Sequence, residues 1–310
     1  MKLLVDIQKQ AWMTAEQFRK AAPELDDHAL RFYPQLGDPA DIVMLAVDSL
    51  RPGLAARLPN LRLVQKLGAG VETIVGAPEL PVHIRVARVR APAMAMEMAR
   101  YCLWQVLQDV HNAAFHRREQ AACRWTPAAP KRVADLTAGV LGLGEIGGAC
   151  ARLLVSAGFT VFGWSRSPKE FEGVACRHGE SGLMEILGRA DYLLSVLPAT
   201  AETSGLFDKT RFAAMREDAV FINVGRGTLV VEAALLAALD AGRPRHAVLD
   251  VCRAEPLPAD SPLWRHPRLT ITPHVSGWDF AGGFAVVAEN WRRLRDGRPL
   301  LHEVDRAAGY

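Results

Sequence analysis

Three segments in the second half of the chain each carry a reactive side chain just past a β-prone run. They are Asn223-Val-Gly-Arg226-Gly227, Asp250-Val-Cys-Arg-Ala-Glu255 and Thr272-Pro-His274. A guanidinium can hold a carboxylate in a bidentate fork and polarise a neighbouring ketone oxygen. An imidazolium can protonate the oxygen that becomes negative, and a carboxylate can orient that imidazole. Arg226, Glu255 and His274 are therefore candidate catalytic residues for the reduction of a 2-oxo acid.

Each of these residues also has an ordinary interpretation. Arg226 can be a loop cation between glycines, Glu255 a turn residue, and His274 a histidine hydrogen-bonded within its own loop. Their joint occurrence downstream of a dinucleotide-binding motif favours the catalytic interpretation.

That motif is Val140-Leu-Gly142-Leu-Gly144-Glu-Ile-Gly147, a G-x-G-x-x-G between a β-prone run and a helical segment. The first glycine permits a tight turn, the second lets the main chain approach a pyrophosphate, and the third lets helix pack on strand. An ordinary glycine-rich turn is the alternative. We expect a dinucleotide to contact Gly142, Gly144, Glu145, Ile146 and Gly147, with Glu145 acting on the helix start electrostatically rather than chemically.

The next β-prone run ends without the acidic residue that usually binds the ribose hydroxyls of NAD. Ser165 occupies that position, and Arg166, Ser167 and Lys169 follow it. These hydroxyls and cations suit a 2′-phosphate, because charge-assisted hydrogen bonds favour the anion. A solvated basic loop is the alternative. The sequence predicts NADP(H) as the preferred cofactor, with NAD(H) possible.

Two alternating series of β-prone runs and helical segments must position these residues. The runs span residues 2–7, 42–46, 63–66 and 84–86, then 138–142, 160–164, 192–197, 219–224, 246–251 and 269–272. Such alternation predicts mostly parallel sheets covered on both faces, and the six later strands suit a doubly wound dinucleotide-binding domain. Residues 15–22 and 52–58 suit helices, as do Met94 to about Arg118 and a C-terminal segment from about Gly283.

Chain length, net charge and cysteine content limit the class of protein that this sequence can form. A chain of 310 residues is natural for two domains, and its net charge of +3 predicts neither a nucleic-acid nor a membrane partner. Five widely spaced cysteines without a Cys-x-x-Cys pair favour reduced thiols over a disulfide framework or zinc site. We find neither a signal peptide nor an apolar run of about 20 residues, so the sequence predicts a cytoplasmic protein without metal.

The chain resembles the D-isomer-specific 2-hydroxyacid dehydrogenase family over nearly its whole length. The matching strings are the glycine loop, Asn223-Val-Gly-Arg-Gly227, Leu249-Asp-Val251, Glu255-Pro-Leu-Pro258 and Thr272-Pro-His274. Three more strings resemble the glyoxylate/hydroxypyruvate reductase A branch: Trp164-Ser-Arg-Ser167, Ser261-Pro-Leu-Trp-Arg-His-Pro-Arg268 and Val304-Asp-Arg-Ala-Ala-Gly-Tyr310.

The resemblance implies an architecture and an activity. Residues 1–92 and 283–310 would form a flavodoxin-like α/β substrate domain, and residues 93–282 a Rossmann-type dinucleotide-binding domain. The activity implied is NAD(P)H-dependent reduction of glyoxylate or hydroxypyruvate to the D-2-hydroxy acid, in a homodimer.

The resemblance also implies residue roles. His274 would be the proton donor, Glu255 its partner, and Arg226 the group that holds the substrate's carboxylate and ketone oxygen. The main-chain N–H groups of Gly68, Ala69 and Gly70 would bind the same carboxylate. The remaining implied dinucleotide contacts are Leu197, Pro198, Thr203 near the phosphates, Val224, Gly225, and Asp250 near the nicotinamide carboxamide. Glu97 lies where the linking helix usually carries an acid.

Two departures from the family pattern concern substrate size and packing. Cys252 replaces a common aromatic residue, which we interpret as a packing change. Trp278 can reshape the substrate pocket, or it can be a core or interface residue.

Two other functions are compatible with this sequence. The protein can be a dehydrogenase for bulkier 2-oxo acids, or a non-catalytic protein of the same fold that senses dinucleotide.

Overall fold

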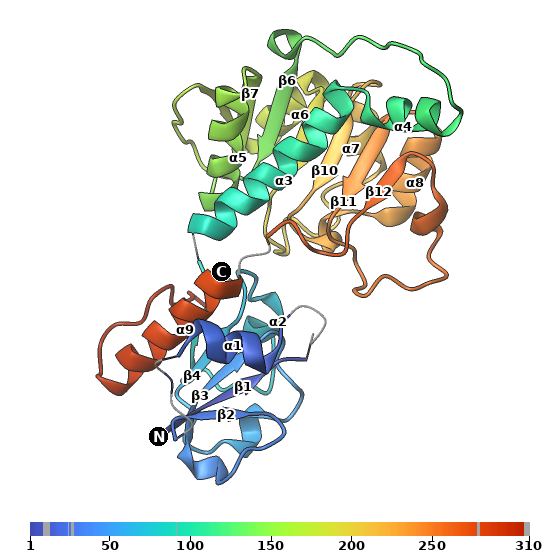
Figure 1. Cartoon of the computed structure of the whole chain (residues 1–310). Helices are drawn as coiled ribbons and strands as arrows, with labels where there is room; N and C mark the ends of the chain where they lie inside the picture. Colours follow the sequence, from blue (N-terminus) through green and yellow to red (C-terminus); the bar gives the residue numbers. More distant parts are fainter. Residues whose placement is uncertain (9–12, 24, 26–27, 91, 278–279, 307–310) are drawn as a thin grey trace. The chain divides into compact units, whose positions relative to one another are not determined.

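The computed structural model describes residues 1–8, 13–23, 25, 28–90, 92–277 and 280–306. The chain divides into two compact units (Figure 1). Unit 1 comprises Met1–Ala93 and Asp279–Tyr310, and unit 2 comprises Met94–Trp278. The boundaries expected from the sequence lie at 92/93 and 282/283.

Unit 1 is built on a five-stranded parallel sheet in the order β2-β1-β3-β4-β5. Its strands are β1 Lys2–Asp6, β2 Leu30–Phe32, β3 Ile42–Val47, β4 Leu63–Lys66 and β5 Arg85–Ala87. Every residue of β3 is buried, as expected for a strand covered on both faces. The order confirms the flavodoxin-like prediction. The sequence missed β2, a three-residue edge strand that is too short to show a period.

The helices of unit 1 are α1 Ala15–Ala21, α2 Glu72–Val75 and α9 Phe280–Arg295. A capping box between Thr14 and Gln17 starts α1. Residues 52–58 form only a three-residue 3-10 turn, Ala55–Arg57, so the helix expected there is wrong. Gly53 takes a left-handed φ of 71°, which a helix cannot continue through. The C-terminal α9 buries Val287 and Trp291 in the core of this unit.

Unit 2 is built on a seven-stranded parallel sheet in the order β12-β11-β10-β9-β6-β7-β8. Its strands are β6 Thr137–Leu141, β7 Thr160–Ser165, β8 Val174–His178, β9 Tyr192–Ser195, β10 Val220–Asn223, β11 His246–Leu249 and β12 Leu269–Ile271. This order confirms the doubly wound prediction. The sequence missed β8, whose residues are half-buried or exposed and lack a buried apolar run.

The helices that accompany this sheet are α3 Pro92–Val110, α4 Ala113–Ala121, α5 Glu145–Ser156, α6 Gly179–Arg189, α7 Lys209–Ala214 and α8 Glu232–Asp240. The single helix expected from Met94 to about Arg118 is wrong, because the chain breaks between α3 and α4 (Figure 1). Asn112 has a left-handed φ of 54°, a conformation that asparagine tolerates better than most residues. None of the residues of α4 is buried.

Over the ranges described, no helix is long and apolar enough to span a bilayer.

Candidate active site

The three reactive segments leave one edge of the sheet of unit 2. Strands β10, β11 and β12 are neighbours, and their registers pair Asn223 with Leu249 and Leu249 with Ile271. Since the strands are parallel, the loops that carry Arg226, Glu255 and His274 all begin at their carboxyl ends. This is the edge at which open α/β sheets bind ligands.

His274 and Glu255 form an ion pair if the imidazole is protonated. Nδ1 of His274 lies 2.8 Å from Oε2 of Glu255, and the side chains are 37% and 23% exposed. The other carboxylate oxygen of Glu255 accepts the N–H of Cys252 at 3.1 Å. Glu255 is therefore held in place while it orients the imidazole, an arrangement suited to proton transfer at Nε2.

The main chain around His274 is bonded to Asp250. The N–H of His274 donates to the carbonyl of Asp250 at 2.8 Å, and those of Val275 and Ser276 donate to its carboxylate at 2.9 and 3.0 Å. Asp250 is only 1% exposed. The structure thus places this expected cofactor contact directly beneath the histidine loop.

The Arg226 loop lies tightly against the segment that leads to Glu255. A Cβ on Gly227 would lie 2.0 Å from the carbonyl carbon of Cys252, so only glycine fits there. Asn223 braces the loop, donating to the carbonyl of Arg226 at 2.9 Å and accepting the N–H of Gly225 at 3.2 Å. The arginine and glutamate segments are therefore packed against each other.

Cys252 itself contributes a protonated thiol. Burial, followed by the nearby carboxylates of Glu232, Glu255 and Asp250, raises its pKa to about 11. Its side chain is 9% exposed, in agreement with a packing role.

The glycine loop between β6 and α5 has the shape that a pyrophosphate requires. Gly142 has a φ of 102°, and a Cβ on Gly147 would lie 1.8 Å from the Gly142 carbonyl oxygen. A Cβ on Gly144 would meet nothing within 4 Å, and no side chain in the described part of the chain caps α5. The open main chain at a helix start fits a phosphate-bearing cofactor.

Leu197, a further expected contact, borders this loop, and the expected contact Thr203 lies in the turn after it. Cβ atoms built on Gly142 and Gly225 would lie 3.1 and 2.6 Å from atoms of Leu197, so Leu197 lies between the two turns. Thr203 is held in its own turn, where its hydroxyl donates to the carbonyl of Pro198 at 2.7 Å and accepts the N–H of Thr200 at 2.8 Å.

The four residues expected at the 2′-phosphate divide into two pairs. Ser165 is buried and its hydroxyl donates to the carbonyl of Ser167 at 2.8 Å, while Lys169 donates to the carbonyl of Leu143 in the glycine loop at 2.8 Å. Arg166 and Ser167 are exposed. Lys169 therefore ties the basic loop to the glycine loop, a contact that the sequence did not predict.

The expected substrate loop lies in unit 1, after β4. The carbonyl of Gly68 accepts the N–H of Val89 at 3.0 Å, and that of Ala69 accepts a guanidinium N–H of Arg88 at 3.3 Å. Of the other singled-out residues, Glu97 pairs with Arg100 on α3, and Trp278 lies outside the described residues.

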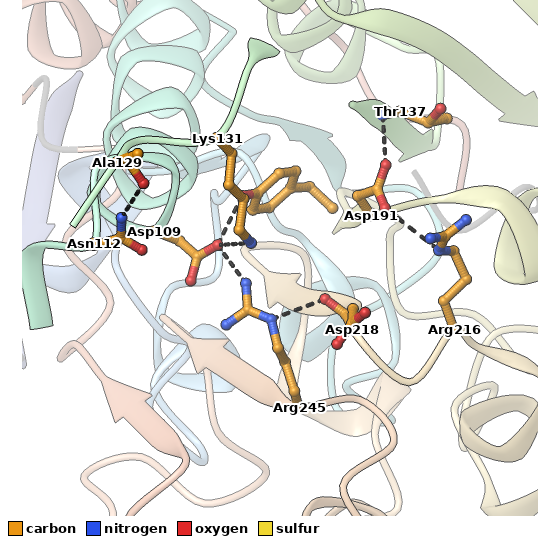
Figure 2. A network of polar contacts seen from close by, with 10 residues as sticks. Asp109, Asn112, Ala129, Lys131, Thr137, Asp191, Arg216, Asp218 and Arg245 are labelled. Carbon is orange, nitrogen blue, oxygen red and sulfur yellow. Dashed lines mark hydrogen bonds and ion pairs between the residues drawn. The ribbon is translucent and has the colours of Figure 1, made fainter. Parts of the chain in front are cut away.

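A second polar cluster lies at the amino-terminal ends of the strands of unit 2, the opposite edge from the site (Figure 2). Its centre is Asp109 at the end of α3, which accepts bonds from Lys131 at 3.0 Å, Tyr192 at 2.7 Å and Arg245. Burial acts to raise the pKa of Asp109, but these donors outweigh it and lower the pKa to about 2. We interpret this cluster as structural.

Comparison with known proteins places the chain among its relatives. The model for the NAD-binding domain of D-isomer-specific 2-hydroxyacid dehydrogenases matches residues 103–276. A glyoxylate/hydroxypyruvate reductase A from Klebsiella pneumoniae strain 342 is 37% identical over 256 residues, which cover 81% of this chain and 82% of the relative.

Solved structures agree over the full length. A D-isomer-specific 2-hydroxyacid dehydrogenase from Xanthobacter autotrophicus Py2, in complex with NADPH and MES, is 38% identical with a TM-score of 0.87, covering 100% of this chain and 99% of that one. An NADPH-dependent glyoxylate/hydroxypyruvate reductase from Sinorhizobium meliloti, in complex with NADP and sulfate, is 32% identical with a TM-score of 0.91 and the same coverage. With more than half of its residues matched by the family model, this chain belongs to the D-isomer-specific 2-hydroxyacid dehydrogenase family.

Proposed function

We propose that the protein reduces small 2-oxo acids, glyoxylate or hydroxypyruvate, to D-2-hydroxy acids with NADPH as the preferred reductant. The observation that carries this proposal is the His274–Glu255 pair, 2.8 Å apart, at the same sheet edge as the glycine loop and Arg226. The names of the relatives support the substrate class.

In the proposed reaction a dinucleotide held by the glycine loop would supply the hydride that C2 of the substrate accepts. Arg226 holds the carboxylate and polarises the ketone oxygen. His274 gives a proton from Nε2 to that oxygen. Glu255 keeps the imidazole oriented for this transfer through its contact with Nδ1. Hydride and proton together convert the 2-oxo acid to the 2-hydroxy acid. In the reverse direction His274 accepts the proton.

We assign cofactor binding to unit 2 and substrate binding to unit 1. The glycine loop would hold the pyrophosphate, and the exposed Arg166 and Ser167 the 2′-phosphate. Leu197, Pro198, Thr203, Val224, Gly225 and Asp250 complete this proposed set. The main-chain N–H groups of Gly68, Ala69 and Gly70 would bind the substrate carboxylate.

We further propose a cytoplasmic homodimer. Trp125, shortly after α4, is fully exposed, Trp104 on α3 is half exposed, and α4 buries no residue, all of which suit a protein–protein interface.

The test is the initial rate of NADPH and NADH oxidation with glyoxylate, hydroxypyruvate and phenylpyruvate. We expect the fastest turnover with NADPH and one of the two smaller acids. Turnover of phenylpyruvate alone would keep the mechanism and change the substrate. Tight dinucleotide binding without any turnover would overturn the proposal and favour a sensor of dinucleotide.

A further inference from the structure

A chain of hydrogen bonds runs from helix α3 to the buried carboxylate beneath His274. The hydroxyl of Thr272 donates to Oδ1 of Asp250 at 2.6 Å. The hydroxyl of Tyr101, in the middle of α3, lies 2.6 Å from the Thr272 hydroxyl oxygen. Tyr101 and Thr272 are 171 positions apart in the sequence, so only the fold brings them together.

The direction of these bonds follows from their chemistry. The Thr272 hydroxyl has one proton and a carboxylate can only accept, so Thr272 donates to Asp250 and Tyr101 donates to Thr272. Burial is the largest effect on the Tyr101 phenol and raises its pKa to about 12, so it keeps its proton at neutral pH. The chain is thus Tyr101 to Thr272 to Asp250, ending on an ionised group.

The carboxylate of Asp250 also holds the main chain that directly follows His274. Its two oxygens accept the N–H groups of Val275 and Ser276, while the Asp250 carbonyl accepts that of His274. His274 has a φ of 57°, a left-handed conformation that is strained for a residue with a side chain. Strain of this kind persists only where surrounding bonds enforce it.

We propose that Thr272 and Tyr101 are positioning residues for His274, acting through the carboxylate of Asp250. This role rests on the proposed function, in which His274 is the proton donor. The hydroxyl of Thr272 fixes Asp250, Asp250 fixes the loop from His274 to Ser276, and Tyr101 fastens the assembly to α3. The imidazole is thereby held against Glu255, with Nε2 left to donate a proton in the proposed reaction.

The experiment compares Thr272→Val with Thr270→Val. Both changes replace a threonine hydroxyl by a methyl group of similar size. The hydroxyl of Thr270, on β12, lies 3.0 Å from Nε2 of His246, so its partner is this histidine rather than Asp250. Thr272→Ser keeps the hydroxyl that bonds Asp250, and Tyr101→Phe removes only the hydroxyl that bonds Thr272.

We expect Thr272→Val to lower kcat with glyoxylate by about ten- to a hundredfold, because small misplacement of a catalytic group is costly. The KM for NADPH should change less than kcat does, since Asp250 is only one of the proposed cofactor contacts and the glycine loop is untouched. The solvent deuterium isotope effect on kcat should rise as proton transfer becomes slower. Thr272→Ser should restore most of kcat, Tyr101→Phe should lose less than Thr272→Val, and Thr270→Val should behave as wild type.

Hydrogen exchange supplies a readout that needs no turnover. The amides of Val275 and Ser276 should exchange faster in Thr272→Val than in Thr270→Val. A wild-type kcat in Thr272→Val, or equal losses in both valine variants, would overturn the positioning role alone. Failure of the wild type to reduce any 2-oxo acid would overturn the proposed function, and this role with it.

Discussion

At the scale of single residues, the proposed chemistry rests on side chains that the main chain holds in defined positions. Glu255 is fixed by the N–H of Cys252 before it contacts His274 at 2.8 Å, and the loop of Arg226 is braced by Asn223. Removing one of these reactive groups should therefore affect the reaction far more than the fold.

His274→Ala should lower kcat/KM for glyoxylate by about 10²–10⁴-fold, the usual cost of losing a general acid. Arg226→Ala should cause a loss of similar size, because the substrate loses both its carboxylate anchor and the polarising charge. Steady-state rates and thermal unfolding of the purified variants check this. The control is His83→Ala, an exposed histidine of unit 1 that should keep full activity. Near-normal turnover in a folded His274→Ala enzyme would refute the assignment.

Arg166→Ala should weaken the binding of NADPH about ten- to a hundredfold, because one hydrogen bond to a charged group contributes about 1.5–3 kcal/mol. The binding of NADH, which lacks the 2′-phosphate, should hardly change. Lys169→Ala provides the contrast. Since Lys169 donates to the carbonyl of Leu143 in the glycine loop, its loss should weaken the binding of NADPH and of NADH to a similar degree. Fluorescence titrations with each dinucleotide measure this, and an equal loss of NADPH and NADH in Arg166→Ala would contradict the assignment.

At the scale of elements, the Asp109 cluster fastens the end of α3 to the sheet of unit 2. Asp109 accepts bonds from Lys131 in the segment that follows α4, from Tyr192 at the start of β9, and from Arg245 before β11 (Figure 2). The same helix carries Tyr101 nearer its middle. Helix α3 therefore joins a structural cluster at one edge of the sheet to the histidine loop at the other.

The cluster predicts a pH dependence of stability. The pKa of Asp109 lies at about 2 in the folded protein against an ordinary 3.8, so its ionised form favours folding. This contribution, about 2 kcal/mol, is complete above about pH 4 and is lost as the pH falls through 2. Urea unfolding should show Asp109→Asn less stable than wild type by about 2–3 kcal/mol at pH 7, with the difference shrinking below pH 4. A difference that does not depend on pH would contradict the electrostatic origin.

At the scale of the whole molecule, the proposed dimer makes a prediction about mass. The wild type should elute in light-scattering experiments at twice the 33.9 kDa of one chain. Trp125→Ala should shift it toward the monomer, because a fully exposed indole has the area to anchor an interface. Val82→Ala, at an apolar residue of unit 1 that is 90% exposed, is the control. A monomeric wild type at micromolar concentration would refute the dimer.

Much of the fold could be predicted from the sequence because it depends on local patterns. Glycine spacing fixes the turn after β6, and buried runs such as β3 and β10 mark strands in parallel sheets. The errors fall where the local signal is weak or ambiguous. Edge strands β2 and β8 lack a buried run, and the apolar period around Asn112 continues although the helix stops.

For the site, the sequence by itself determined which residues can do chemistry and that three of them follow parallel strands. Residue type and the order of strands are sufficient for that, since parallel strands present their carboxyl ends at one edge. Only the tertiary structure decided that Asp250 lies beneath His274, that Lys169 bonds the glycine loop, and that Tyr101 supports Thr272. Those contacts join residues 24 to 171 positions apart, and their existence depends on strand register and on how α3 packs on the sheet.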